Sequence, residues 1–167
     1  MTDLYDLDPE EGVTAYPVTD ERSLARRIAL QALYEIDSAH HPAAEVIARQ
    51  LQAQRASARV GQYMQKLVYG TAANIELLDD VIRRYAPEWP LEQIAIIDRN
   101  ILRMAIFEFA LQQRTPVSVA IDEAVELAKL FGAEGASAFV NGVLGALADD
   151  EAVLQTLRQQ ADETTEP

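Results

Sequence analysis

Two neighbouring segments in the second half of the chain carry apolar residues at helical spacing, and this pattern constrains the fold most. In residues 120–131 the expected core face repeats at i, i+3, i+4, i+7 and i+10, and Gly132 follows where a helix end favours a residue that tolerates positive φ. Residues 137–147 keep the spacing through Asn141-Gly142, a dipeptide otherwise typical of a turn. Because glycine inside a helix costs ~1 kcal/mol, we expect close packing or a bound group there. The core face predicted for the first segment consists of Ile121, Ala124, Val125, Ala128 and Phe131.

Helical periodicity also dominates the remainder of residues 19–148, where we find no strand-like alternation. It predicts helices over 19–37, 43–55, 57–85 and 91–111, with Thr19 or Asp20 capping the first and Ser57 the third. Gly70 predicts a kink or a close helix crossing. Pro87 and Pro90 mark a rigid linker between helical groups at about 19–86 and 91–148. With a short helix over 152–158, the prediction is an all-α fold of about seven helices.

The net charge of −13 is distributed unevenly along the 167 residues. Residues 1–20 hold six acids and no base, and residues 149–167 hold six acids and one base. The net charge of residues 21–148 is therefore −2, and that of residues 21–60 within them is +2. We expect residues 1–18 to be a disordered acidic arm and 149–167 an acidic tail. The electrostatic potential near a site, not the net charge of the whole chain, decides whether nucleic acid binds there. The negative net charge therefore does not exclude nucleic-acid binding.

The sequence lacks the residue patterns that several kinds of enzyme and metal site require. The chain has no cysteine and only two histidines, and no Glu-x-x-His pair or glycine-rich phosphate loop. The motif most similar to a Glu-x-x-His metal-binding pair is Asp37-x-x-His40. It falls at a helix end and is more simply a capping or solvated pair. No secretory signal or membrane-length apolar run is evident. We therefore expect a cytoplasmic protein that is not an enzyme and needs no cofactor or metal.

Binding residues are concentrated at the start of the first predicted helix. Arg22 and Arg26 are an i, i+4 pair, and Arg27, Gln31 and Tyr34 form a second stripe at i, i+4, i+7. Arginine contacts phosphate and stacks on bases, tyrosine stacks, and glutamine reads a base edge. The two stripes favour single-stranded RNA, and the alternative is a solvated arginine face.

Six segments share one further feature, their similarity to a known family: Ala25 to Tyr34, Leu67 to Gly70 with Asn74, Leu78-Asp79, Ile97 to Arg103 with Glu108, Ala120 to Gly132, and Ser137 to Gly145. Through these segments the chain resembles the NusB family of transcription antitermination proteins from about Glu21 to Ala148, and both tails lie outside the resemblance. The resemblance implies two packed helical bundles in one domain. It also implies binding of the boxA element of ribosomal RNA leader transcripts, together with the ribosomal protein NusE, in a complex with RNA polymerase. Relatives are monomers or homodimers, and both states stay open here.

The resemblance also implies roles for individual residues. The arginine-bearing first helix contacts RNA, although Ser23 and Leu24 interrupt the arginine run that relatives have. Tyr85, Ser137, Phe139 and Asn141 lie near the RNA path, and Asp98 and Arg99 face NusE. From the residues alone, packing explains the tyrosine, phenylalanine and asparagine, and Arg99 with Arg103 indicates a solvated edge. We expect Glu108 to be a buried acid paired with an arginine.

Two other functions remain as alternatives to antitermination. One is a helical accessory domain that serves an RNA-modifying enzyme in trans, and the other is a structural scaffold without RNA affinity. The acidic arm adds a separate hypothesis: residues 1–18 mimic phosphate beside Arg22 and Arg26 and weaken non-specific RNA binding.

Overall fold

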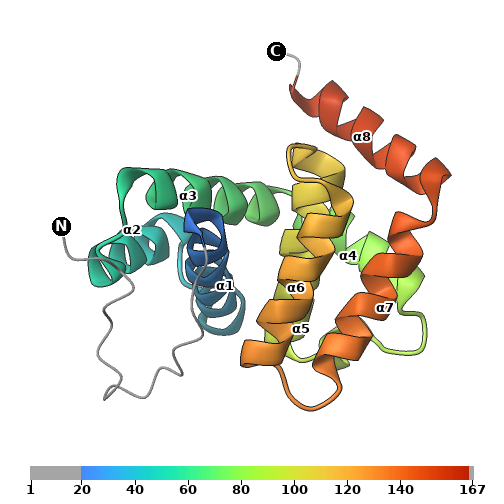
Figure 1. Cartoon of the computed structure of the whole chain (residues 1–167), viewed down its shortest axis with the longest axis horizontal. Helices are drawn as coiled ribbons and strands as arrows, with labels where there is room; N and C mark the ends of the chain where they lie inside the picture. Colours follow the sequence, from blue (N-terminus) through green and yellow to red (C-terminus); the bar gives the residue numbers. More distant parts are fainter. Residues whose placement is uncertain (1–19, 166–167) are drawn as a thin grey trace. The chain divides into compact units, whose positions relative to one another are not determined.

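The computed structural model describes residues 20–165, and all regular elements in this range are helical (Figure 1). The all-α class is confirmed, with eight α-helices between these residues instead of about seven. Thr19 and the predicted acidic arm lie outside the described residues. The helices are α1 (Glu21–Ala39), α2 (Ala43–Gln54), α3 (Ala58–Ala73), α4 (Ile75–Tyr85), α5 (Ile96–Ile106), α6 (Val117–Phe131), α7 (Ala136–Ala148) and α8 (Glu151–Thr165).

Polar side chains set the helix starts that the sequence predicts. The Asp20 carboxylate accepts a hydrogen bond from the backbone N–H of Ser23 at 2.7 Å and caps α1. Ser57 Oγ accepts from the N–H of Val60 at 3.3 Å at the start of α3. The first helix ends at Ala39, two residues later than predicted, where His40 adopts a left-handed conformation with φ 57°.

The predicted helix 57–85 is two helices that separate at Asn74, not at Gly70. Asn74 Nδ2 donates a hydrogen bond to the carbonyl oxygen of Gly70 at 2.7 Å, which stabilises the end of α3. Gly70 instead marks a close crossing, because a Cβ there would collide with the ring of Phe107. Of the two alternatives predicted for Gly70, close packing is therefore the correct one.

The predicted helix 91–111 is interrupted as well. A 3-10 turn over Leu91–Gln93 precedes α5, and a π-helical segment over Phe107–Gln112 follows it. The π segment ends at Gln113, which has φ 61°. A periodicity of apolar residues alone does not distinguish α-helical from π-helical turns, so this division was not predictable.

The described chain forms two compact units, one that ends at Val68 and one that begins at Tyr69. This division lies within α3, whereas the sequence indicated the linker between Pro87 and Pro90. Helix α4 belongs to the second unit because it packs on α5 and α7. In the first unit α1 packs along α2. Its buried apolar residues include Ala25, Ile28, Ala29, Val46, Ile47, Val60 and Met64.

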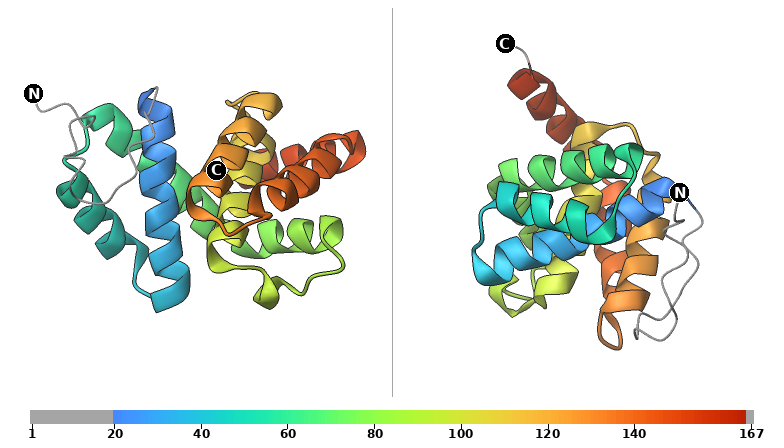
Figure 2. Two further views of the ribbon diagram at one scale, coloured as in Figure 1. Left: turned by 60° about the horizontal axis from the view of Figure 1, so that its bottom comes forward. Right: turned by 90° about the vertical axis from the view of Figure 1, so that its left-hand side faces the viewer.

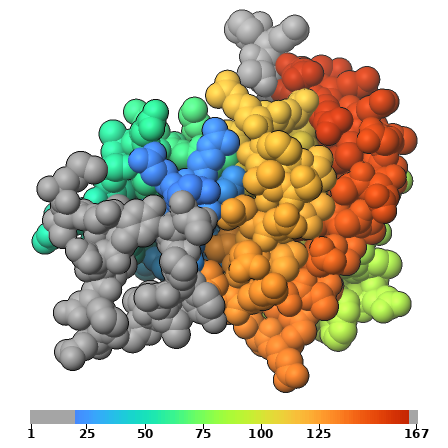
Figure 3. Space-filling model, in the orientation of Figure 1, coloured from blue at the N-terminus to red at the C-terminus, as the bar shows by residue number. Residues whose placement is uncertain are grey.

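In the second unit α6 packs against both α5 and α7, and α6 and α7 run side by side (Figures 1 and 2). Figure 3 shows α6, α7 and α8 following one another across one face of this unit. The predicted tail helix is longer than expected and folded onto the unit, because Leu154 and Leu157 of α8 are buried. The buried apolar residues of α5 to α7 include Ile101, Leu102, Met104, Ala124, Leu127, Ala128, Val140, Leu144 and Leu147.

Two expectations for α6 and its end are wrong, and one of the two alternatives for α7 is excluded. The core face of α6 is rotated toward Ala120 and Leu127, so that Phe131 is exposed. Gly132 has φ −83° and not the positive φ that was expected. Glycine is needed there for its small size, because a Cβ would lie 2.5 Å from the Cβ of Ala136. Gly142 lies inside α7, but a Cβ on it would meet no described atom within 4 Å. Close packing therefore does not explain Gly142.

Among residues 20–165, no helix combines the length and the apolarity that a membrane crossing requires.

Candidate nucleic-acid interface

The predicted stripe on α1 forms a polar and aromatic face. Gln31 and Tyr34 are exposed, with Tyr34 at 44% of its full accessibility, and Arg27 is half-buried. Gln31 Oε1 accepts a hydrogen bond from Gln54 Nε2 of α2 at 3.5 Å. Because i, i+4 and i+7 positions share one side of a helix, these three side chains present one guanidinium, one amide and one phenol group together.

The two other arginines of α1 lie against an aromatic ring that the sequence did not single out. The guanidinium carbons of Arg22 and Arg26 lie 5.1 and 5.7 Å from the centroid of the Tyr63 ring on α3. These distances are typical of cation–π contacts. Arg22 is exposed, whereas Arg26 is only 2% exposed. The expectation that Arg26 faces RNA therefore needs correction, because its side chain packs inside the first unit.

A cleft of about 380 Å³ lies between the start of α1 and α3. Residues of α3 line it together with the beginning of α1. A pattern in the sequence could have revealed them, because Arg59, Tyr63 and Lys66 repeat the i, i+4, i+7 spacing of the α1 stripe. The lining residues are Glu21, Arg22, Arg59, Gln62, Tyr63 and Lys66.

In the second unit the structure brings together Asp98 and Phe139, which sequence reasoning had assigned to different partners. Both line a pocket of about 390 Å³ formed by residues 89–95, the first turns of α5 and the start of α7. Trp89, the only tryptophan of the chain, lies at its edge and is 54% exposed. The sequence placed Trp89 in the linker and did not single it out as a pocket residue. Gly135, whose φ is 86°, also lines the pocket before the first turn of α7.

The carboxylate of Asp98 is the chemically distinctive group of this pocket. The side chain is buried, and its Oδ1 has no hydrogen-bond partner among the described residues. Burial raises the pKa of Asp98 above its ordinary value. A buried acceptor without a partner is costly, and this oxygen is itself buried, close to Gly132 at the end of α6.

The other predicted residues of α5 and α7 do not join this pocket. Ser137 is half-buried and Asn141 is exposed, and their i, i+4 spacing puts both on one side of α7. Phe139, two positions from each, points to the pocket instead. Arg99 is half-buried on α5. The three residues of α7 therefore form two separate surfaces.

Tyr85, at the end of α4, has a structural partner. Its hydroxyl donates a hydrogen bond of 2.6 Å to Asp150 Oδ2, and Asp150 Oδ1 accepts from the N–H of Val153 in the first turn of α8. Burial, aided by this bond and by the charge of Asp150, raises the pKa of Tyr85 to about 12. The bond from Tyr85 lowers the pKa of Asp150. The ring of Tyr85 is half-buried, and the guanidinium carbon of Arg84 lies 6.0 Å from its centroid.

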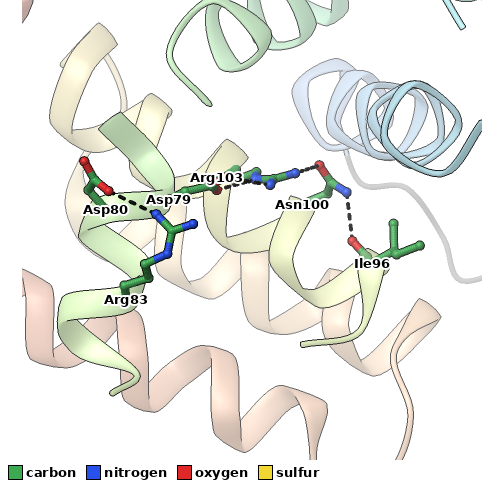
Figure 4. A network of polar contacts seen from close by, with 6 residues as sticks. All are labelled: Asp79, Asp80, Arg83, Ile96, Asn100 and Arg103. Carbon is green, nitrogen blue, oxygen red and sulfur yellow. Dashed lines mark hydrogen bonds and ion pairs between the residues drawn. The ribbon is translucent and has the colours of Figure 1, made fainter. Parts of the chain in front are cut away.

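Arg103, Asp79 and Glu108 are interior groups, and of these only Arg103 was predicted on a helix surface. Arg103 is buried and pairs with Asp79 of α4, and it also donates to Asn100 Oδ1 at 3.2 Å (Figure 4). The predicted solvated edge at Arg103 is therefore wrong. Glu108 is buried as predicted, and its Oε1 accepts from Thr115 Oγ1 at 3.2 Å.

These groups define an all-helical protein whose surfaces are suited to binding unpaired bases and phosphate. Within residues 20–165, no three histidine or acidic side chains converge on a metal site. One surface offers arginine, glutamine and tyrosine on α1, and the other is a pocket lined by Trp89, Phe139 and the acid Asp98. Stacking, phosphate contact and base-edge recognition all use such groups.

Comparison with known proteins identifies the family. The NusB family model matches residues 23–149. The transcription antitermination protein NusB of Dehalococcoides mccartyi is 41% identical over 145 residues, which are 87% of this chain and 100% of that protein. The protein of the same name from Bacillus pumilus is 40% identical over 130 residues, covering 78% of this chain and 96% of the relative.

Solved structures agree with the sequence relatives. The fold is similar to T. maritima NusB, with a TM-score of 0.72, 29% identity, and coverage of 80% of this chain and 94% of that one. A structure of the antitermination factors NusB and NusE in complex with double-stranded RNA matches with a TM-score of 0.72 and 25% identity, over 77% and 96% of the two chains. The chain belongs to the NusB family of transcription antitermination proteins, which are not enzymes.

Proposed function

We propose that the protein binds single-stranded, boxA-type RNA of ribosomal RNA leader transcripts together with NusE. The complex then joins the elongating RNA polymerase in the cytoplasm and suppresses termination. Support comes from the family, from a structural relative solved with NusE and RNA, and from the two surfaces described above. Arg99 of α5 is our candidate for contact with NusE.

The observation that carries this proposal is a pocket that Asp98 lines together with two aromatic residues, Trp89 and Phe139. An unpaired base stacks on Phe139 or Trp89, and its exocyclic amine donates to the Asp98 carboxylate. Amines of this kind are present on cytosine, adenine and guanine but not on uracil, so the pocket discriminates between bases. The proposal therefore assigns Asp98 to contact with RNA and not, as the resemblance implies, to NusE.

The α1 face supplies contacts of a different kind. Arg27 contacts a phosphate, Tyr34 stacks on a base, and Gln31 hydrogen-bonds to a base edge. Arginine–phosphate contacts make the affinity depend on salt but not on sequence. The α1 face therefore accounts for affinity, whereas the Asp98 pocket accounts for preference among sequences.

Fluorescence anisotropy with a labelled boxA-type RNA, with and without NusE, tests the proposal. Arg27→Ala with Tyr34→Ala is expected to weaken binding at least tenfold, because one stacked base alone is worth ~1–3 kcal/mol. Asp98→Asn is expected to reduce the preference for the cognate over a base-substituted RNA. Lys129→Ala, which removes an exposed charge of α6 in a pair with Glu126, is the control and leaves binding unchanged.

Two results would contradict the proposal. Absence of binding by the folded wild-type protein, with and without NusE, would favour the scaffold or the accessory role. Unchanged sequence preference in both Asp98→Asn and Phe139→Ala would exclude the pocket as a base-reading site while leaving the α1 face intact.

A further inference from the structure

The cleft between α1 and α3 is built from both helices of the first unit. Arg59, Tyr63 and Lys66 lie on one side of α3, and Gln62 lies beside them. Arg59 and Lys66 are seven residues apart, which is about 10 Å along a helix axis. Together with Arg22, they give the cleft three cationic side chains against a single acid, Glu21.

Internal pairing does not account for these charges. The Arg59 side chain is 85% exposed, and its Nη1 lies 3.9 Å from Glu21 Oε2. Charge-assisted hydrogen bonds are ~2.7–2.9 Å long, and exposed ion pairs contribute only ~0–1 kcal/mol. Lys66 is also exposed. Both cations therefore remain accessible to an external anion at little cost to the fold.

Tyr63 gives the cleft a fixed arrangement. Its half-buried ring lies under the guanidinium groups of Arg22 and Arg26, at 5.1 and 5.7 Å from its centroid. Because the ring restrains Arg22, less side-chain freedom is lost when that arginine binds an anion. The charge of the surrounding chain makes this cleft distinctive. Residues 20–68 contain seven bases and five acids, whereas the whole chain carries −13.

We propose that this cleft is a phosphate-binding track for the single-stranded RNA that continues beyond the segment bound by the α1 face. Arg59 and Lys66 neutralise successive parts of the backbone, and Tyr63 is a positioning residue for Arg22. The length of the row fits a stretch of backbone better than one small anion. This inference rests on the proposed function and extends the RNA footprint from α1 onto α3.

The test uses the full chain and two labelled RNAs, the boxA-type element alone and the element with a single-stranded extension. The double variant Arg59→Gln with Lys66→Gln is expected to bind the short RNA like wild type. For the extended RNA, the slope of log affinity against log salt concentration becomes shallower by about 1.4, since each lost contact to a single strand contributes ~0.7. Arg49→Gln removes an exposed charge of the same unit, one paired with Glu35, and is the matched control.

A second pair of variants tests the positioning role. Tyr63→Leu is expected to weaken binding of the extended RNA and to reduce the salt slope, because Arg22 loses its aromatic support. Tyr63→Phe keeps a ring for the cation–π contact and is expected to restore both. Circular dichroism melting curves establish that each variant is folded.

Three outcomes separate this inference from the proposed function. An unchanged salt slope for the extended RNA in the double variant would overturn the phosphate track, although the short RNA still binds. Tighter binding of the short RNA by the double variant would assign the cleft to the acidic N-terminal segment instead. Failure of the wild-type protein to bind either RNA would overturn the proposed function and the track together.

Discussion

Arg103 of α5 and Asp79 of α4 form a buried, two-pronged ion pair. Nε of Arg103 donates to Oδ1 of Asp79 at 2.7 Å, and Nη2 donates to Oδ2 at 2.9 Å. Asn100 accepts from Nη1 of the same arginine and donates from Nδ2 to the carbonyl oxygen of Ile96 (Figure 4). The pair therefore joins α4 to α5, the helix that also carries Asp98.

Arg103→Met is expected to lower the free energy of unfolding by ~3–5 kcal/mol, because it leaves the buried Asp79 carboxylate without its cation. Adding Asp79→Leu is expected to recover most of the loss, since an apolar pair of similar volume often replaces a buried ion pair without cost. Urea unfolding followed by circular dichroism gives both values. A loss below about 1 kcal/mol in the single variant would show that water compensates the carboxylate.

The starts of helices and the fold class were predictable because interactions between residues close in sequence determine them. The Asp20 and Ser57 caps and the all-α class follow from residues close together in sequence. Arg103 shows the opposite case. Its i, i+4 spacing with Arg99 is typical of a solvated edge, and the ion pair with Asp79, which is 24 residues earlier, makes burial favourable. A partner so distant in sequence leaves no periodic signal.

The candidate site was predictable to a similar degree. Arg22, Arg27, Gln31 and Tyr34 were found from their spacing, and the structure places all four at least partly at the surface. The spacing does not reveal that Tyr63 lies beneath Arg22, or that Asp98 and Phe139 line one pocket. Those relationships depend on how helices pack against each other.

Gly70→Ala tests the close crossing of α3 with the π-helical segment. A Cβ at position 70 would collide with the Phe107 ring, and overpacking costs typically ~1–3 kcal/mol. We expect a loss of this size in urea unfolding, and Phe107→Leu in the same chain to relieve part of it. Gly142→Ala is the control. It adds a methyl group in open space within α7 and is expected to stabilise the protein by up to ~1 kcal/mol.

Tyr85→Phe tests the bond between α4 and the start of α8. The raised pKa of Tyr85, about 12, means that the phenol stabilises the fold below its ordinary pKa and that this contribution is lost as pH rises through about 12. The lowered pKa of Asp150 means that its contribution is lost as pH falls through that value.

We therefore expect Tyr85→Phe to be less stable than wild type at neutral pH, and the difference to shrink in acid, where Asp150 takes up a proton. Thermal melts across pH measure this. Tyr69→Phe, a change at an exposed tyrosine of the same unit, is the control. A difference that is independent of pH would show that the hydroxyl packs without using the charge of Asp150.

Deletion of residues 2–18 tests the acidic arm, which lies outside the described residues. Residues 1–20 carry six acids and lead directly to Glu21 and Arg22, at the edge of the α1–α3 cleft. If this segment lies over the cleft, its charge lowers the affinity of the cleft for phosphate. We therefore expect the deletion to tighten binding of both RNAs, most strongly at low salt. Exposed charges act over only about 8 Å at ~0.15 M ionic strength, so the effect should fade as salt rises.

A variant with all acids of residues 2–18 changed to their amides separates charge from chain length, because it should match the deletion. Equal affinity of wild type, deletion and amide variant across the whole salt series would show that the arm has no influence on RNA.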